Sequence, residues 1–381
     1  MRLRVAIEST ALLGSRSGIG EFTYSLLASL PDKNWQVDAF AISWRRRAQL
    51  VDLLPEGVGR INRPLPARPL HAMWRHSEFP PIDLLLGHYD LIHGANFVVP
   101  PTRTSARVLT VHDLTPVRFP QLCHPSVLVF PALVQRAIDR GAFVHTPTEA
   151  VRGEVIEVFG ADEDRVVAIH HGMSATTRVD DPVGSIPPRL FGEVVPGRQM
   201  VLAVGTIEPR KDYPMLLRAF DELVGGGVDA YLVIAGARGW GADEFDRVLA
   251  RMSNRDKVVT LGWVSEQERQ WLYSNANVFV YPSIYEGFGL PPLEAMAHQL
   301  PVVVTAVDAV QEVVGDACMV VAVGDSSALA DAMRAVLLDA ELAHALGLRG
   351  LERTREFSWE RSARAFHELY RRAIGERHGK S

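Results

Sequence analysis

Short apolar segments alternate with helical patterns along this chain, and this alternation restricts its fold more than any other feature. Strand-like segments separated by helical ones are typical of a parallel sheet with helices on both faces. The first half is therefore predicted to form strands at residues 3–8, 36–42, 89–93, 107–112, 143–146 and 166–170, with helices at 21–30, 127–140 and 149–159.

The same alternation starts again after residue 198. Strands are predicted at 200–204, 231–235, 258–261, 278–281, 302–305 and 319–323, and helices at 214–224, 244–252 and 266–276. Ser265 and Glu268 have the spacing of a capping box at the start of the last of these helices. Near the end of the chain, residues 358–374 have apolar positions at close to helical spacing, which predicts an amphipathic helix.

Residues 181–198 contain four prolines and three glycines without periodicity, which is typical of a linker. A chain of 381 residues is also long enough for two domains with separate cores. We therefore predict an N-terminal domain at 1–180, a linker at 181–198, a C-terminal domain at 199–357 and a terminal segment at 358–381. Two α/β domains joined by a linker imply a cleft.

The composition narrows the class of protein. The formal net charge of -5 argues against general nucleic-acid binding, which requires a basic surface. Cys123 and Cys318 are the two cysteines, and their separation fits a reducing compartment without a disulfide framework. No apolar run reaches the roughly 18 residues that span a bilayer. We expect a cytoplasmic protein that is soluble or attached only to a membrane surface.

Residues 285–297, YEGFGLPPLEAMA, place two carboxylates around a glycine-rich turn. They follow the predicted strand at 278–281, and Pro291 and Pro292 suit the first turn of a helix, where N–H groups are spare. Free amides at residues 287–290, with the positive end of the helix dipole, would form an anion site flanked by Glu286 and Glu294. An ordinary strand-to-helix turn, in which Glu294 only complements the dipole from the first turn, remains an alternative.

Arg210 and Lys211 directly precede the predicted helix at 214–224. Cations at a helix N-terminus are unfavourable unless an anion lies nearby, so the pair is a candidate clamp for a diphosphate. The alternative is a solvated pair neutralised by Glu208 or Asp212.

Two candidates lie in the first half. Gly14, Gly18 and Gly20 precede a helix after the first strand, so the backbone could approach a ligand there. They lack the dinucleotide spacing, which argues against a nicotinamide site, and a turn without a ligand remains open. His112 is the last residue of the predicted strand at 107–112 and is a candidate substrate contact or a packed histidine.

Seven arginines lie between Trp44 and Arg75, with tryptophans at positions 44 and 74. A basic face with aromatic side chains can dock on anionic lipid headgroups, although a merely solvated surface is equally compatible with the composition.

Taken together, these motifs resemble the retaining glycosyltransferases of family 4, whose GT-B fold has two Rossmann-like domains facing across a cleft. The resemblance covers nearly the whole chain. Its hallmark is a Gly-Phe-Gly core between two glutamates, matched here from Glu286 to Glu294, together with the Arg-Lys pair. Ser-Trp-Glu at 358–360 resembles the start of the family's last helix, which crosses back to the N-terminal domain. The family's Asn-Gly-Val-Asp is replaced by residues 170–174, HHGMS, so no ligand contact is expected there.

The resemblance implies a role for each matching residue. Glu286 would hold hydroxyls of the donor sugar, Glu294 the ribose, and Arg210 with Lys211 the diphosphate. The remaining donor contacts would come from Gly18, Gly20, His112, Gly287, Phe288, Gly289, Leu290 and the segment 262–264, whose Val264 would lie behind the base.

By the same resemblance, the expected activity is hexosyl transfer in bacterial surface-polysaccharide assembly. No metal-binding Asp-x-Asp motif appears where a metal would be needed, so the transfer is expected to be metal-independent. A GDP-sugar carrying mannose or rhamnose is the favoured donor, a UDP-sugar is the second choice, and the acceptor is a lipid-linked glycan at the inner face of the membrane. No cofactor is expected. A nucleotide-sugar epimerase of the same fold and a non-catalytic nucleotide-sugar sensor remain alternatives.

Overall fold

The structure, a computed structural model, describes residues 2–14, 18–173, 187–190, 192 and 198–379 and divides into two compact units. Unit 1 comprises Met1–Gly172 with Phe357–Ser381, and unit 2 comprises Met173–Glu356. The division falls at residue 172 and not at 180, so residue 173 belongs to unit 2, and Phe357 belongs with the C-terminal segment. Most of the predicted linker, 181–198, lies outside the described residues.

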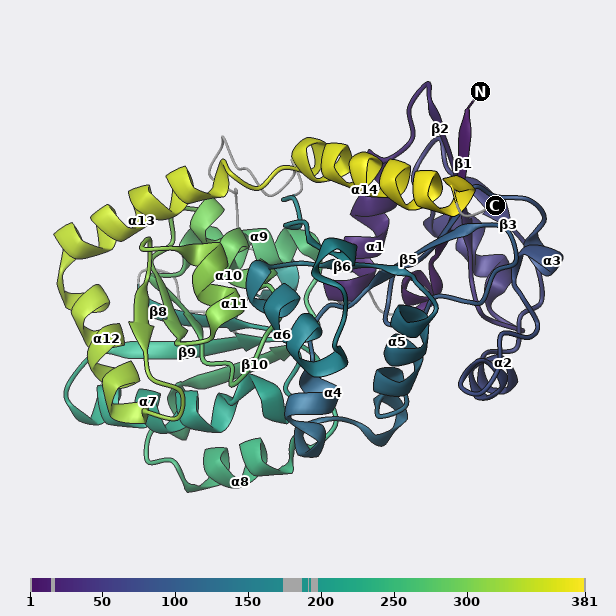
Figure 1. Ribbon diagram of the computed structural model, residues 1–381. Coiled ribbons are helices and arrows are strands. Elements are labelled where there is room, and N and C mark those ends of the chain that lie inside the picture. The colour runs from purple at the N-terminus through teal and green to yellow at the C-terminus, as the bar shows by residue number, and fades with distance from the viewer. Residues whose placement is uncertain (1, 15–17, 174–186, 191, 193–197, 380–381) are drawn as a thin grey trace. The chain divides into compact units, whose positions relative to one another are not determined.

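Unit 1 is built on a seven-stranded parallel sheet in the order β3-β2-β1-β4-β5-β6-β7 (Figure 1). Its strands are β1 (Leu3–Glu8), β2 (Trp35–Phe40), β3 (Gly59–Ile61), β4 (Leu91–Gly94), β5 (Ala106–Thr110), β6 (Phe143–Thr146) and β7 (Val166–Ala168). Its helices are α1 (Gly18–Ser29), α2 (Ala67–Trp74), α3 (Asp83–Leu86), α4 (Thr115–Arg118), α5 (Phe130–Asp139), α6 (Glu149–Phe159) and α14 (Trp359–Gly379). All six strands predicted for this half are present. Strand β3 and helices α2 to α4 were not predicted, because their sequence patterns are short or weak.

Unit 2 repeats this architecture with a six-stranded parallel sheet in the order β10-β9-β8-β11-β12-β13. Its strands are β8 (Gln199–Val204), β9 (Ala230–Ala235), β10 (Val258–Gly262), β11 (Val278–Tyr281), β12 (Val302–Thr305) and β13 (Met319–Val321). Its α-helices are α7 (Tyr213–Gly225), α8 (Asp243–Arg251), α9 (Glu266–Asn275), α10 (Leu290–Ala297), α11 (Asp308–Val314), α12 (Ser326–Leu338) and α13 (Ala340–Thr354). The capping box of Ser265 and Glu268 is confirmed, whereas helices α11 to α13 were not predicted.

The core of unit 2 explains why its strands read as continuous apolar runs. Every residue of β9 and β11 is buried, because helices cover both faces of the sheet and two hydrophobic clusters form, one on each side. Parallel strands need such crossover helices, so the alternation seen in the sequence follows from the sheet itself.

The C-terminal helix α14 belongs to unit 1, as predicted. Phe366, Leu369 and Tyr370 on one side of it join the core formed by β1, β4 and α1. The returning chain passes so close to Gly172 that a Cβ atom there would lie 2.2 Å from the backbone nitrogen of Trp359. Gly172, within the segment that departs from the family pattern, is therefore required by packing.

A chain of buried polar groups connects α14 to the sheet. The Tyr370 hydroxyl lies 2.7 Å from Nδ1 of His93, and His93 Nε2 lies 2.8 Å from Oγ1 of Thr110. Thr110 in turn contacts Nδ1 of His145 at 3.0 Å, and His145 Nε2 donates to the carbonyl of Ile169. Burial lowers the pKa of His93 well below its usual range and that of His145 to about 3, so both rings are neutral near neutral pH.

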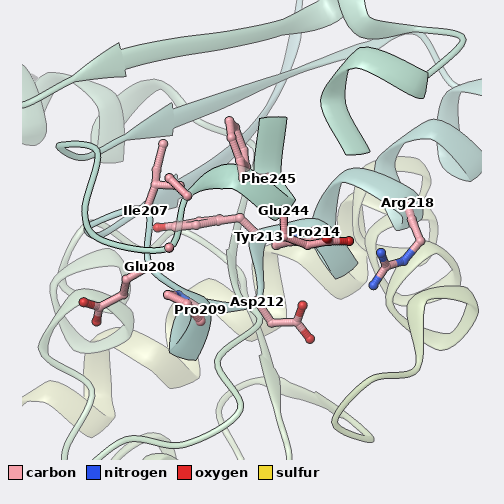
Figure 2. Close-up of a pocket in the computed structure, with 11 residues that line it drawn as sticks. Ile207, Glu208, Pro209, Asp212, Tyr213, Pro214, Arg218, Glu244 and Phe245 are labelled. Atoms are coloured by element: carbon pink, nitrogen blue, oxygen red, sulfur yellow. The ribbon is translucent and has the colours of Figure 1, made fainter. Parts of the chain in front are cut away.

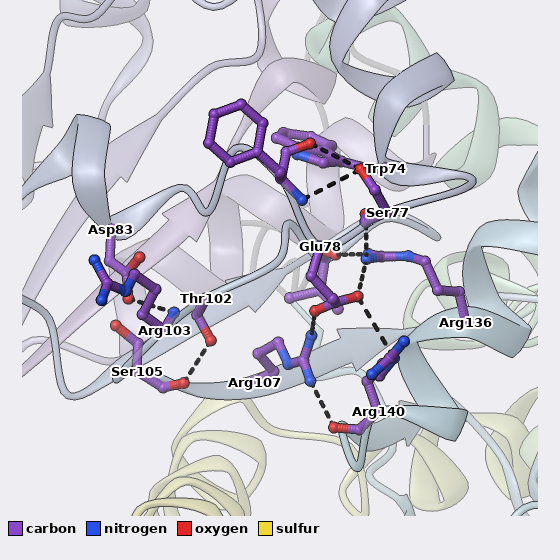
Figure 3. A network of polar contacts seen from close by, with 12 residues as sticks. Trp74, Ser77, Glu78, Asp83, Thr102, Arg103, Ser105, Arg107, Arg136 and Arg140 are labelled. Atoms are coloured by element: carbon purple, nitrogen blue, oxygen red, sulfur yellow. Dashed lines mark hydrogen bonds and ion pairs between the residues drawn. The ribbon is translucent and has the colours of Figure 1, made fainter.

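At the opposite, amino-terminal end of β5, Glu78 holds a group of arginines together (Figure 3). Arg107 donates to its Oε2 at 2.9 Å and Arg136 to its Oε1, while Arg140 lies 4.0 Å away. The side chains of Arg107 and Arg136 are only 9% and 11% exposed, so Glu78 neutralises charge that solvent reaches poorly. This network fixes the loop before α3 onto β5 and α5.

Candidate active site

The two sheets identify where a ligand is expected in each unit. Strand order reverses direction between β1 and β4 in unit 1 and between β8 and β11 in unit 2. In open α/β sheets, ligands bind beyond the carboxyl ends of the strands at such a reversal. The loop after β8 carries Arg210 and Lys211, and the loop after β11 carries Glu286, so all three predicted residues flank the reversal of unit 2.

The predicted strand, glycine turn and helix are present at this point. β11 ends at Tyr281, and α10 begins at Leu290 with Pro291 and Pro292 in its first positions. Gly289 precedes the helix with φ of 100°, a left-handed value that favours glycine. A side chain at this position would strain the turn that presents the loop amides.

Glu286 lies at the centre of a buried cluster. Its Oε1 accepts hydrogen bonds from Nζ of Lys211 at 2.6 Å and from the hydroxyl of Ser283 at 2.8 Å. Its Oε2 forms an ion pair with Arg210. The residue is 7% exposed, and the structure therefore joins two predicted cations to one predicted carboxylate from another loop.

The cations have further partners. Lys211 Nζ donates to the hydroxyl of Tyr281 at 2.7 Å, and Arg210 donates to Glu208 at 2.9 Å and to the carbonyl of Tyr285 at 3.0 Å. Lys211 is 8% exposed. The alternative of a solvated cation pair is therefore wrong for Lys211, although Glu208, one of the partners named in that alternative, does pair with Arg210.

Burial and charge act in opposite directions on this cluster. Burial would raise the pKa of Glu286, but the charges of Arg210 and Lys211 and their hydrogen bonds lower it to about 2. The pKa of Lys211 is lowered, because burial and the neighbouring Arg210 outweigh the attraction of Glu286. At Glu286 the attraction of the charged partners outweighs the effect of burial on the pKa, whereas at Lys211 the effect of burial is larger. Pairing prevails at Glu286, since this carboxylate faces two cations, whereas Lys211 faces the cation Arg210 as well as the anions Glu286 and Glu208.

Glu294 lies apart from this cluster, on α10. Its Oε2 accepts a hydrogen bond from the hydroxyl of Tyr273 at 2.9 Å, and its Oε1 lies 3.5 Å from Arg269. Both partners come from α9, and sequence reasoning missed them because no local pattern relates the two helices. Glu294 is the fifth residue of α10, so the prediction that it lies in the first turn is wrong.

The remaining predicted donor contacts of unit 2 lie on two loops. Gly287, Phe288 and Gly289 are buried in the loop before α10, and Leu290 begins that helix half-buried. Val264 follows β10 and packs partly buried against the core that includes Leu261. Their contacts with a donor stay predictions.

His112, Gly18 and Gly20 belong to unit 1. His112 is 7% exposed, its Nε2 donates to the carbonyl of Ala95 at 2.9 Å, and burial lowers its pKa. The neutral ring then carries its unprotonated nitrogen at Nδ1. Gly18 begins α1, and a Cβ on Gly20 would lie 3.2 Å from the carbonyl oxygen of Ala11, so close packing alone favours glycine there.

A pocket of about 190 Å³ is lined by residues on either side of Arg210 and Lys211 in the sequence, among them Glu208 and Asp212. Figure 2 shows the residues that line it. Tyr213 and Phe245 contribute apolar surface, and the carboxylates of Glu208, Asp212 and Glu244 line it with a single guanidinium, that of Arg218. Three carboxylates disfavour an anion, so this pocket is unsuited to a diphosphate.

The arginine-rich segment differs in part from expectation. Six of its seven arginines are exposed, Arg47 is half-buried, and Trp44 is 58% exposed. Trp74, however, is completely buried and donates its indole N–H to the carbonyl of Pro80 at 3.0 Å. The prediction that both tryptophans belong to a docking face is therefore wrong for Trp74.

Neither a metal cluster nor a membrane-spanning helix is found in the described parts of the chain. No group of three or more histidine, cysteine, aspartate or glutamate side chains there is arranged to hold a metal ion. None of the helices formed by these residues has the length and apolar character needed to cross a membrane.

Comparisons with known proteins agree with this arrangement. Residues 16–176 match the model of "Glycosyltransferase Family 4", and residues 192–353 match that of "Glycosyl transferases group 1". The O-antigen chain mannosyltransferase B of Escherichia coli is 33% identical over 273 residues, which cover 71% of each chain. The D-inositol 3-phosphate glycosyltransferase of Kineococcus radiotolerans is 29% identical, covering 81% of this chain and 75% of that protein.

Among solved structures, the sucrose-phosphate synthase of Thermosynechococcus elongatus superposes with a TM-score of 0.76 at 21% identity. The match covers 99% of this chain and 100% of the synthase, and it shows that both share the GT-B fold. The full-length fold, the two domain matches and the 33% identity lead to one conclusion: the chain belongs to the glycosyltransferases of group 1 and family 4.

Proposed function

We propose that this glycosyltransferase moves mannose or D-rhamnose from a GDP-sugar to a lipid-linked glycan, with retention of the anomeric configuration and without a metal ion. The observation that carries the proposal is the cluster of Glu286, Arg210 and Lys211 at the strand reversal of unit 2. The similarity to an O-antigen mannosyltransferase supports the choice of sugar and of a surface polysaccharide as product.

The cluster supplies what a departing diphosphate needs. Arg210 offers a planar fork and Lys211 a compact charge, and the poorly solvated position of both strengthens their attraction to a phosphate. Preorganised charges of this kind often contribute more to the rate enhancement of an enzyme than any other effect. Glu286 and Glu208 already neutralise these cations, so a bound diphosphate would compete with carboxylates that are in place before it arrives.

We propose attack on the same face as departure. The bond between the anomeric carbon and the diphosphate oxygen breaks while a bond to the acceptor hydroxyl oxygen forms. The proton of that hydroxyl passes to the departing diphosphate, which avoids a separate protein base. Glu286 would meanwhile orient hydroxyls of the donor sugar, and His112 in unit 1 would contact the sugar.

Peripheral attachment to an anionic membrane at the cytoplasmic face is proposed for the arginine-rich segment. Its exposed arginines and Trp44, together with Phe79 at 62% exposure, combine positive charge with apolar side chains. Sedimentation with anionic vesicles at low salt tests this part, and failure of the purified protein to sediment would remove it.

The function is tested by incubating the protein with GDP- and UDP-sugars, with and without a synthetic lipid-linked acceptor. Acceptor-dependent consumption of a GDP-sugar with an α-linked product from an α-linked donor is expected, and added chelator should leave the rate unchanged. Consumption of a UDP-sugar would move the assignment to a UDP-dependent transferase. Isomerisation without acceptor would indicate an epimerase, and binding without turnover a sensor.

A further inference from the structure

The predicted linker contains a short segment that is part of unit 2. Residues Pro188–Leu190 form one 3-10 turn, η7, and the side chain of Leu190 is completely buried in the cluster that contains Leu261 and Trp271. A flexible connection would not bury a leucine. This turn therefore holds the neighbouring residue, Arg189, at a defined place on the surface of unit 2.

Arg189 spans the loop that follows β10. Its Nη2 donates to the carbonyl of Leu261 at 2.6 Å, and its Nη1 donates to the carbonyl of Trp263 at 2.8 Å. Nη1 also lies 3.2 and 3.3 Å from the two carboxylate oxygens of Glu268. One planar guanidinium thus holds the peptide groups on both sides of Gly262 and the first turn of α9.

The loop needs such support from outside. Gly262 has φ of 67°, a left-handed value, and among the described residues a Cβ there would meet no atom within 4 Å apart from those of its chain neighbours. The neighbouring Trp263 is 58% exposed, so its side chain does not anchor the loop in the core. Hydrogen bonds from Arg189, about 70 residues earlier in the chain, therefore add to the pairing of Gly262 with Ala235 of β9 and to the packing of Val264 in holding this backbone.

Glu268 completes the support. It is 6% exposed and accepts a hydrogen bond from the backbone N–H of Ser265 at 2.6 Å as well as the contact from Arg189. Burial alone would raise its pKa, but the hydrogen bonds from Ser265 and Arg189 lower it, so it remains a carboxylate. The capping box and the guanidinium form one continuous network along the loop.

We infer that Arg189 is a positioning residue for recognition of the nucleotide base. The inference rests on the proposed function and on the family resemblance, by which segment 262–264 would lie behind the base of the donor. A protein distinguishes one base from another by placing hydrogen-bonding groups at fixed positions opposite the edge of the base. Backbone N–H and C=O groups can do this only where the backbone itself is held in place. Arg189 holds two carbonyls of this loop and thereby limits which backbone groups face the base.

The contacts of Arg189 mainly fix the position of the loop and contribute little to the stability of the protein. The side chain of Arg189 is 51% exposed, so its ion pair with Glu268 contributes little to the free energy of unfolding. Loss of this side chain should leave the fold intact and loosen the loop. Affinity for the diphosphate moiety, which is assigned to Arg210 and Lys211, should not change.

Calorimetric titration of GDP, UDP and pyrophosphate into the full-length protein separates these effects. In Arg189→Ala, the dissociation constant of the nucleoside diphosphate that the wild type prefers should rise about tenfold, which corresponds to the loss of about one hydrogen bond between the loop and the base. Its preference over the other nucleotide should fall, and pyrophosphate should bind as in the wild type. Arg189→Lys should be intermediate, because one ammonium cannot span both carbonyls.

Arg198→Ala is the matched control, since Arg198 pairs with exposed Asp229 near the same linker and does not contact the loop. It should leave all three dissociation constants unchanged. Equal losses for pyrophosphate and nucleotide in Arg189→Ala, or no change in either, would overturn the inference alone. A wild-type protein that binds neither nucleotide would instead overturn the proposed function on which it rests.

Discussion

Replacement of Glu286 by glutamine gives the sharpest test of the charge cluster. The substitution keeps the shape of the side chain and removes its charge, which leaves the buried Lys211 and Arg210 without their shared anion. A lowering of the Glu286 pKa from 4.5 to about 2 corresponds to about 3 kcal/mol of stability at neutral pH. For a domain of the size of unit 2, this is a fall in melting temperature of about 6–12 °C.

The effect should depend on pH in a defined direction. Because the folded pKa lies below the unfolded value, the contribution of Glu286 is complete above pH 4.5 and is lost as the pH falls towards about 2. Melting curves of wild type and Glu286→Gln, recorded by calorimetry, should therefore converge in acid. Glu244→Gln is the control, because Glu244 pairs with Arg247 at the surface and should cost about 0.5 kcal/mol or less.

The same variant should bind pyrophosphate more tightly than the wild type, because Glu286 no longer neutralises the clamp. Transfer of sugar should nevertheless be lost if Glu286 orients the donor hydroxyls. A change in stability at neutral pH below about 1 kcal/mol, or weaker binding of pyrophosphate, would refute this account of the cluster.

Four further predictions concern single groups. Lys211→Ala should lower turnover by about a hundredfold or more in the transfer assay, and near-normal turnover would exclude the clamp. Glu294→Ala should raise the dissociation constant of free nucleotide about tenfold in calorimetry, and an unchanged value would remove its ribose role. Glu78→Gln should destabilise unit 1 by about 1.5–3 kcal/mol in urea unfolding, since two poorly solvated arginines lose their charged partner, and a loss within error would contradict that. His145, with a folded pKa of about 3, should make unit 1 lose stability as the pH falls from 6.5 towards 3, and His145→Gln should flatten that dependence in acid denaturation.

Much of the fold follows from local pattern. The strands β1, β6, β11 and β12 have the bounds that their apolar runs predicted, because a strand covered on both faces leaves a continuous signal. Helices α11 to α13 were not predicted from the sequence, although the structure forms helices there. The linker prediction overlooked η7, since a buried Leu190 within a proline-rich stretch has no periodicity to reveal it.

The candidate site, like the fold, was predicted only in part from the sequence. The amino-acid sequence by itself determined the turn before α10, with its glycines and prolines, and marked Glu286, Arg210 and Lys211 as charged groups at strand ends. Only the tertiary structure decided that these three meet, that Glu294 faces Tyr273, and that Trp74 is buried. The physical reason is that periodicity reports which side of an element is apolar, whereas contacts between residues far apart depend on strand order. The reversal between β8 and β11 brings the two loops together, and no local pattern contains it.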